Sequence, residues 1–192
     1  MARQYTHRLT SMQPVYLIGY MASGKSTIGR ILADKLGWHF VDLDDAFMEI
    51  HGLSTTDYIR QYGIDAFRRK EKYVLEDIAD MAPTETVVYA TGGGYPCYED
   101  NMDCLHELGT SIYIRWKPED LVERLLLTDL SERPVLQGRS RKELLDFVTP
   151  HLAAREEYYK QATLIIDAPG FIPEADEIIA EQICQYLKHK TK

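Results

Sequence analysis

The stretch from Pro14 to Thr27 constrains the fold of this chain more than any other. It reads PVYLIGYMASGKST: a short apolar run, a glycine turn and the start of an amphipathic segment. Gly19, four residues and then Gly24-Lys25-Ser26 form the pattern of a phosphate-binding P-loop. In such a loop, backbone N–H groups curl around an anion, and the N-terminus of the following helix faces it. The alternative is a chance glycine turn before a helix. The apolar strand and the helical spacing that flank the loop favour nucleotide binding.

The P-loop predicts ATP and Mg²⁺ as cofactors. Lys25 supplies a positive charge for the outer phosphates, and the Ser26 hydroxyl can join the ligand shell of the metal ion. The residues expected to hold the nucleotide in this loop are Ala22, Ser23, Gly24, Lys25, Ser26 and Thr27.

Strand and helix signals alternate along the rest of the chain. Strands are predicted at 15–18, 38–41, 86–90, 111–116 and 163–167, with helical segments at 46–50, 54–63, 64–81, 101–108, 118–127, 142–162 and 173–187. This alternation predicts a parallel sheet covered on both faces, in one α/β domain over residues 14–192. Pro150 should break or kink the helical segment around it. Residues 1–13 are expected to form a loose tail.

Composition excludes several classes of protein. The net charge of −8 argues against nucleic acid as a partner. Three cysteines without a Cys-x-x-Cys pair indicate neither a disulfide framework nor a zinc site, so we expect a cytoplasmic protein. No apolar run approaches the roughly 18 residues of a membrane span. A small acidic domain of this kind is expected to be a monomer.

Polar or glycine-rich clusters follow the first three predicted strands. The P-loop follows the first, Asp42-Leu43-Asp44 the second, and Gly92-Gly93-Gly94 the third. Ligands of open parallel sheets bind beyond the carboxyl ends of the strands, so the three clusters should share one pocket. That pocket should hold a nucleotide, a divalent metal ion and a second ligand.

The acidic and glycine clusters suggest the chemistry of this pocket. In an extended segment, Asp42 and Asp44 would point to the same side, one toward Mg²⁺ and the other toward a substrate hydroxyl. Gly92 to Gly94 would let backbone N–H groups approach a small polar ligand. A solvated acidic loop and a tight strand-to-helix turn are the structural alternatives. Because no Asp ends the third strand, the metal is assigned to Asp42 and Ser26.

Four arginines compete for the anionic ligands, and their spacing alone does not choose among them. Arg124 could stack on the adenine, and Arg133 lies in a polar segment, 128–141, with the length of a mobile lid. Arg68 could belong to a solvated helix face, and Arg155 to an intrahelical salt bridge.

The order of motifs resembles the shikimate kinase family over residues 14 to 187. The successive motifs are GYMASGKST, DLDD, FRRKE, ATGGG, RPVL and REEYY. The resemblance implies a three-layer α/β/α P-loop kinase fold like that of nucleoside monophosphate kinases. Its five-stranded parallel sheet would have the order 2-3-1-4-5, with a substrate-binding helical region at about 44–82 and a mobile lid. The chain departs from the family at Ile64, where a glutamate is usual, and at Leu126, where an arginine often occurs.

The resemblance also implies a reaction, the ATP-dependent phosphorylation of the 3-hydroxyl of shikimate on the route to chorismate. Lys25, Asp44 and Arg133 would then be catalytic, with Asp44 as base and Arg133 as the lid arginine. Arg68 and Arg155 would grip the shikimate carboxylate, and Glu71 would orient Arg68. Gly92, Gly93 and Gly94 would line the ring. The rival interpretations are a kinase for gluconate or a nucleoside monophosphate, and a non-catalytic nucleotide-binding module.

Overall fold

A five-stranded parallel sheet forms the centre of the computed structural model, which describes residues 13–81, 86–128 and 136–190. The strand order is β2-β3-β1-β4-β5, as the family resemblance implies. The strands are β1 (Val15–Ile18), β2 (His39–Asp42), β3 (Val87–Ala90), β4 (Thr110–Arg115) and β5 (Leu164–Asp167).

The two strands at the centre of the core, β1 and β3, are buried at every position. Continuous burial is typical of a parallel strand that is covered on both faces, and it explains why these strands are apolar runs without alternation. Tyr16 and Tyr89 are register partners, and their rings stack with centroids 5.0 Å apart. The pair fixes the register of β1 against β3, which brings the loops after both strands to one edge of the sheet.

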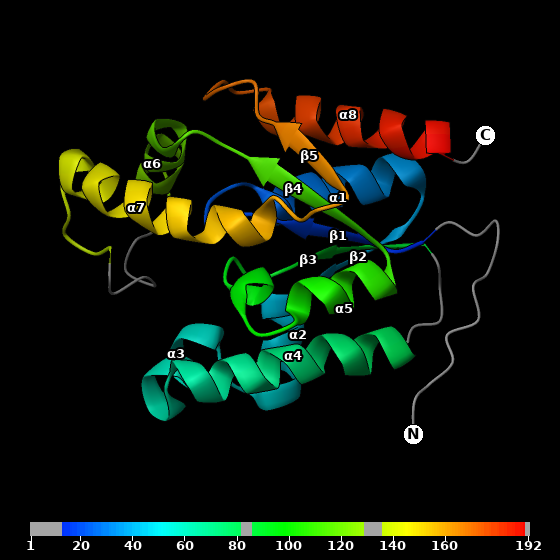
Figure 1. Ribbon diagram of the computed structural model, residues 1–192, viewed down its shortest axis with the longest axis horizontal. Helices are drawn as coiled ribbons and strands as arrows, with labels where there is room; N and C mark the ends of the chain where they lie inside the picture. Colours follow the sequence, from blue (N-terminus) through cyan, green and yellow to red (C-terminus); the bar gives the residue numbers. More distant parts are fainter. Residues whose placement is uncertain (1–12, 82–85, 129–135, 191–192) are drawn as a thin grey trace.

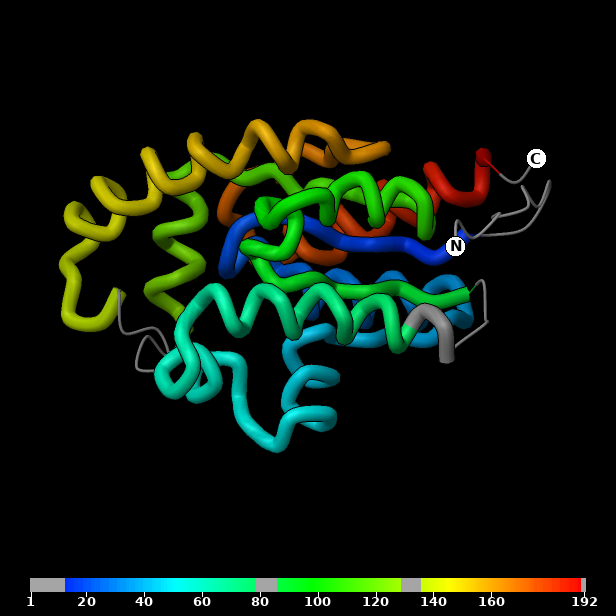
Figure 2. Tube along the Cα trace, turned by 60° about the horizontal axis from the view of Figure 1, so that its bottom comes forward, coloured from blue at the N-terminus to red at the C-terminus, as the bar shows by residue number. Residues whose placement is uncertain are grey.

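Helices cover both faces of this sheet (Figure 1). On one face α1 (Lys25–Leu36) packs beside α8 (Ala175–Lys190), and on the other lie α5 (Asn101–Leu108) and α7 (Arg141–Tyr159). The remaining elements are α2 (Leu43–His51), α3 (Thr55–Tyr62), α4 (Ile64–Met81), the 3₁₀ turn η1 (Tyr95–Cys97) and α6 (Pro118–Leu126). Figure 2 shows α2, α3 and α4 grouped beside the β2–β3 half of the sheet.

Helix α2 begins earlier than the sequence predicts. Asp42 ends β2 in an extended conformation and caps the helix, because its side chain accepts a hydrogen bond from the Asp44 backbone N–H. Asp44 therefore lies in the first helical turn, and the expectation that it shares an extended segment with Asp42 is wrong. The N-cap preference of aspartate explains the difference, since the same acidic run can end a strand and start a helix.

Helix α7 continues through Pro150, so the expected break does not occur. A proline inside a helix costs about 3 kcal/mol through its missing N–H and its ring clash. Two features offset this cost. A capping box joins Ser140 and Glu143 at the N-terminus of the helix. In addition, its inner face packs into the core through the buried side chains of Leu144, Val148, Leu152 and Tyr159.

Two expectations concern residues that lie largely or wholly outside the described ranges. These are the loose tail at 1–13 and most of the lid, residues 129–135, which include Arg133. Among the residues that the structure does describe, no helix is both long and apolar enough to cross a membrane.

Candidate active site

A cleft of about 1280 Å³ opens at the carboxyl edge of the sheet. It combines residues from the P-loop, the start of α2, the α3–α4 pair, α7 and the segment before α8. The predicted site residues that line it are Ala22, Gly24, Lys25, Ser26, Thr27, Asp42, Asp44, Gly93, Arg124 and Arg155. The other predicted site residues in the described part of the chain, Ser23, Arg68, Gly92 and Gly94, are not among the lining residues.

The P-loop forms a tight turn that α1 follows directly. Gly24 occupies the N-cap position in a left-handed conformation, with φ of 86°. The Lys25 Nζ lies within the turn and donates hydrogen bonds to the Gly19 carbonyl at 3.0 Å and the Tyr20 carbonyl at 2.8 Å. The N–H groups of the first turn of a helix have no intrahelical partner, so they remain available to an anion beside the lysine.

Two further P-loop carbonyls accept hydrogen bonds from side chains that lie about 100 residues later in the chain. The Trp116 indole N–H donates to the Ser23 carbonyl at 3.0 Å, and Arg124 Nε donates to the Ala22 carbonyl at 2.7 Å. Arg124 also lies over the Trp116 ring at 4.6 Å and forms an ion pair with Asp176 at 3.0 Å. Arg124 therefore supports the loop as well as lining the cleft.

Ser26 and Asp42 provide oxygen atoms of the kind that Mg²⁺ prefers. The Ser26 hydroxyl donates to Asp42 Oδ2 at 2.5 Å, beside the lysine of the P-loop. The described residues contain no group of three or more histidine, cysteine or acidic side chains that could hold a metal ion alone. Protein sites commonly bind Mg²⁺ through one or two carboxylates together with waters and substrate phosphates, and the oxygen atoms of Asp42 and Ser26 are donors of this kind.

The Asp44 carboxylate is accessible from the cleft and has a perturbed pKa. The protein walls around it remove part of its hydration, and this desolvation raises its pKa, as does the nearby Asp42 charge. Lys25 and Arg68 act in the opposite direction. A carboxyl group with a raised pKa and two cationic neighbours is suited to accept a proton from a hydroxyl near neutral pH.

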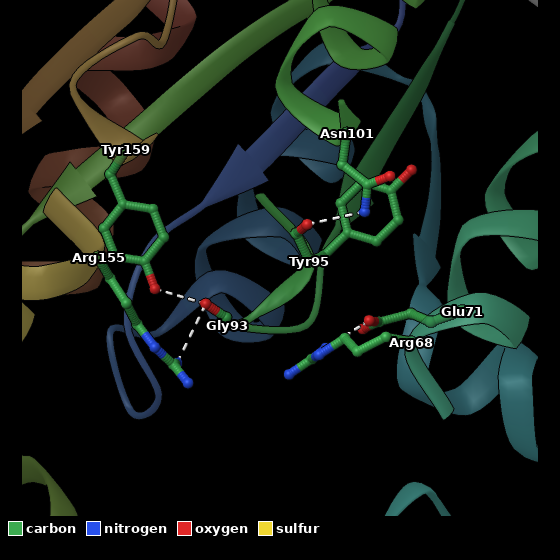
Figure 3. Close-up of polar contacts among 7 residues, drawn as sticks. All are labelled: Arg68, Glu71, Gly93, Tyr95, Asn101, Arg155 and Tyr159. Carbon is green, nitrogen blue, oxygen red and sulfur yellow. Dashed lines mark hydrogen bonds and ion pairs between the residues drawn. The ribbon is translucent and has the colours of Figure 1, made fainter. Parts of the chain in front are cut away.

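Two arginines face each other across the triple-glycine turn (Figure 3). Arg155 Nη1 donates to the Gly93 carbonyl at 3.3 Å, and the Tyr159 hydroxyl donates to the same oxygen at 2.5 Å. Arg68 approaches from α4, and a Cβ at Gly94 would collide with its guanidinium group. The glycine at position 94 thus allows Arg68 to lie against the turn, so the two guanidinium groups point toward a common space.

Glu71 holds Arg68 in this position. It is only 2% exposed and forms an ion pair with Arg68 through Oε2. Its other carboxylate oxygen, Oε1, has no hydrogen-bond partner among the described residues and lies against Gly92, where a Cβ would collide with it. Burial raises the pKa of Glu71 to about 7, although the Arg68 charge opposes the shift.

This shift predicts a pH-dependent stability difference between the wild type and Glu71→Gln. The pKa of Glu71 is about 7 in the folded state and about 4.5 in the unfolded state, so folding favours the protonated side chain. The resulting contribution to stability is complete below about pH 4.5 and is lost as the pH rises through about 7. At about 1.4 kcal/mol per pKa unit, the unfolding free energy of the wild type should fall by up to about 3 kcal/mol relative to the variant across this window. Denaturant titrations from pH 4.5 to 8 test this. Asp77→Asn is the control, because Asp77 is an exposed carboxylate on the same helix. If the unfolding free energies of the wild type and Glu71→Gln changed in parallel with pH, the prediction would be contradicted.

Several residues at the site have no role in the sequence-based prediction. Tyr159 contacts the glycine turn, while Tyr20 and His151 form a hydrogen bond of 2.7 Å beside it. The cleft is also lined by Thr56, Ile59, Arg60 and Ile64 on one side and by Phe171, Ile172 and Pro173 on another. Tyr20 and Tyr159 lie inside the motifs GYMASGKST and REEYY, but from the sequence alone each could equally be a core residue. His151 gives no signal of its own.

Comparison with known proteins identifies the family. The family model described as shikimate kinase matches residues 21–188. A shikimate kinase from Parabacteroides distasonis is 37% identical over 165 residues, which cover 86% of this chain and 93% of the relative.

Solved structures agree with this result. A shikimate kinase from Bacteroides thetaiotaomicron has a TM-score of 0.83 at 32% identity, covering 93% of this chain and 99% of that one. A shikimate kinase from Acinetobacter baumannii in complex with shikimate has a TM-score of 0.79 at 27% identity, with coverage of 95% and 97%. By sequence and by structure, this chain belongs to the shikimate kinase family.

Proposed function

We propose that the chain transfers the γ-phosphoryl group of ATP to the 3-hydroxyl of shikimate, giving shikimate 3-phosphate for chorismate and aromatic amino acid synthesis. One observation carries the proposal: a single cleft is lined by the P-loop lysine, Asp44 and Arg155. A polyphosphate bound at Lys25 would thus share its site with a small acid bound at the arginine. Phosphoryl transfer depends mainly on such positioning and on electrostatic stabilisation.

The nucleotide side of the cleft belongs to the P-loop. Backbone N–H groups from Ala22 to Thr27 surround the phosphates, and Lys25 neutralises charge that develops on the transferred group. Ser26 and Asp42 would hold Mg²⁺, which when bound neutralises phosphate charge and orients the phosphates.

The acceptor side belongs to Asp44, the triple glycine and the arginine pair. Arg68 and Arg155 bind the carboxylate, since a planar guanidinium group matches a carboxylate in two parallel hydrogen bonds. Gly92, Gly93 and Gly94 leave room for the ring. Asp44 orients the reacting hydroxyl and accepts its proton as the oxygen attacks phosphorus in line.

Two arginines complete the proposed nucleotide site. Arg124 would contact the nucleotide from the cleft wall while it supports the loop. Arg133 would close over the phosphates as the lid arginine. Its proposed role depends on the RPVL motif, because it lies outside the described residues.

We also infer a monomer of the cytoplasm. Three of the exposed apolar side chains, Leu127, Phe171 and Ile172, line the cleft, so they need no subunit interface to explain them. The odd cysteine count without a Cys-x-x-Cys pair is the sequence feature that favours a reducing compartment.

An assay of ADP release with different acceptors tests the proposed function. Shikimate with ATP and Mg²⁺ should give turnover at least about a hundredfold above the rate without acceptor, since typical kinases work at about 1–100 s⁻¹. Gluconate and nucleoside monophosphates should give no increase, because neither is a cyclic acid that fits both arginines and the glycine turn. Faster ADP release with gluconate would indicate that the protein is a sugar-acid kinase instead. No stimulation by any acceptor would favour a non-catalytic nucleotide-binding module.

A further inference from the structure

Tyr20 stands between the two halves of the proposed site. It is 1% exposed and lies in the P-loop, directly after Gly19. Its main-chain carbonyl accepts a hydrogen bond from Lys25 Nζ at 2.8 Å. Its side chain extends in the other direction, to α7. The main chain of Tyr20 thus contacts the lysine of the proposed phosphate site, while its ring and hydroxyl contact residues beside the proposed acceptor site.

The Tyr20 hydroxyl is paired with a histidine that also lines the cleft. It lies 2.7 Å from His151 Nδ1, and the two rings meet edge to face with centroids 5.5 Å apart. Phe147 packs on the same histidine ring with centroids 5.0 Å apart. Burial and the Arg155 charge lower the pKa of His151, so the neutral ring is favoured as the partner of the hydroxyl.

Arg155 lies one helical turn after His151 and contacts the same tyrosine. Residues four apart on a helix share a face, so both side chains reach Tyr20 from α7. The Arg155 guanidinium lies over the Tyr20 ring, 5.7 Å from its centroid. It also forms a hydrogen bond of 3.3 Å to the Gly93 carbonyl and a side-chain hydrogen bond with Tyr159, so the Tyr20 ring adds to the polar contacts that orient the guanidinium group.

We propose that the Tyr20–His151 hydrogen bond is a positioning element that holds Arg155 in the orientation that binds the acceptor's carboxylate. The hydroxyl fixes the rotation of the tyrosine side chain relative to α7, and the face of that ring supports the guanidinium group. Neither Tyr20 nor His151 needs to touch the substrate for this role. The inference rests on the proposed function, because it assigns Arg155 to the acid.

Two variants remove the hydrogen bond from opposite sides, and a third restores it. Tyr20→Phe deletes the hydroxyl, and His151→Leu deletes the ring nitrogen at similar side-chain volume. His151→Asn places an amide group close to the position of Nδ1, so it can keep the bond. Tyr113→Phe is the matched control: it removes the hydroxyl of a buried tyrosine that donates to Glu156 on α7 at 3.3 Å, and it keeps the ring that packs against Tyr159.

The readouts are the steady-state constants and the dissociation constant of shikimate measured by calorimetry. Tyr20→Phe and His151→Leu should each raise the KM and Kd for shikimate roughly three- to tenfold, the range expected for loss of one partly buried hydrogen bond. The double variant should be no worse than either single one, because both remove the same bond. The KM for ATP should not change, since Lys25 contacts the Tyr20 main chain. His151→Asn and Tyr113→Phe should behave like the wild type.

A purely structural role would give a different pattern. Equal increases in the KM for both substrates, or a loss of thermal stability with no change in the KM for shikimate, would overturn the proposal. So would a further increase on adding Tyr20→Phe to Arg155→Ala, because the tyrosine would then act without the arginine. These outcomes presuppose a wild type that phosphorylates shikimate, so failure of the proposed function is recognised first and separately.

Discussion

Replacing Lys25 with alanine should lower kcat with shikimate by at least about a thousandfold, the upper range seen when one preorganised electrostatic contact to a transition state is lost. The side chain is 9% exposed, and it lies between two P-loop carbonyls at the position where the phosphates are expected. Arg124 also contacts the P-loop, but the Ala22 carbonyl and Asp176 hold it, so it does not take the place of the lysine. Single-turnover measurements with saturating ATP isolate the chemical step from product release.

The same variant should leave the acid site intact. The Kd of shikimate should stay within about twofold of the wild type, because Arg155 and Arg68 are held by contacts that do not involve Lys25. Lys35→Ala is the control: this exposed lysine lies in the last turn of α1, pairs with Glu181 on α8 at 2.9 Å and does not line the cleft. A Lys25→Ala enzyme with near-normal kcat would remove the lysine from the mechanism.

Replacing Asp44 with asparagine should lower kcat by about 10²- to 10⁴-fold, the usual contribution of a positioned general base. Asparagine keeps the shape of the side chain and its ability to hold a hydroxyl, but it cannot accept the proton. The pH profile separates the two roles. We expect the acidic limb of the wild-type kcat profile to report ionisation of Asp44, and this limb should disappear in the variant.

Asp45→Asn is the matched control for this experiment. It lies next in sequence on the same turn of α2, but its carboxylate points to Arg30 at 3.6 Å rather than into the cleft. Its kinetics should match the wild type. Near-normal turnover by Asp44→Asn would exclude Asp44 as the base.

The sequence predicts the fold well because its strongest signals are local. Gly19, Gly24 and Lys25 specify a loop whose geometry follows from their own backbone preferences. The apolar runs of β1 and β3 specify strands buried on both faces. The strand order is different, because no local pattern encodes it. It follows here from the resemblance to a family, and the structure confirms it.

The details of the site are harder to predict because they depend on contacts between distant residues. The spacing of Asp42 and Asp44 does not reveal that the first caps the helix that contains the second. Nor does the charge of Arg124 reveal that Trp116 and Asp176 hold it behind the P-loop. A role for His151 can be recognised only from the structure, where α7 brings it within hydrogen-bond distance of Tyr20. In each case the partner is supplied by tertiary packing.

The support of the P-loop by Trp116 and Arg124 has a consequence for the newly made protein. The fourteen-residue motif is made before the donors that fix two of its carbonyls, which follow about 100 residues later. A truncated chain that ends before β4 would contain the whole motif and still lack a rigid receptor for phosphate. Tight capture of ATP is therefore expected only after Trp116 and Arg124 have been made and packed against the loop.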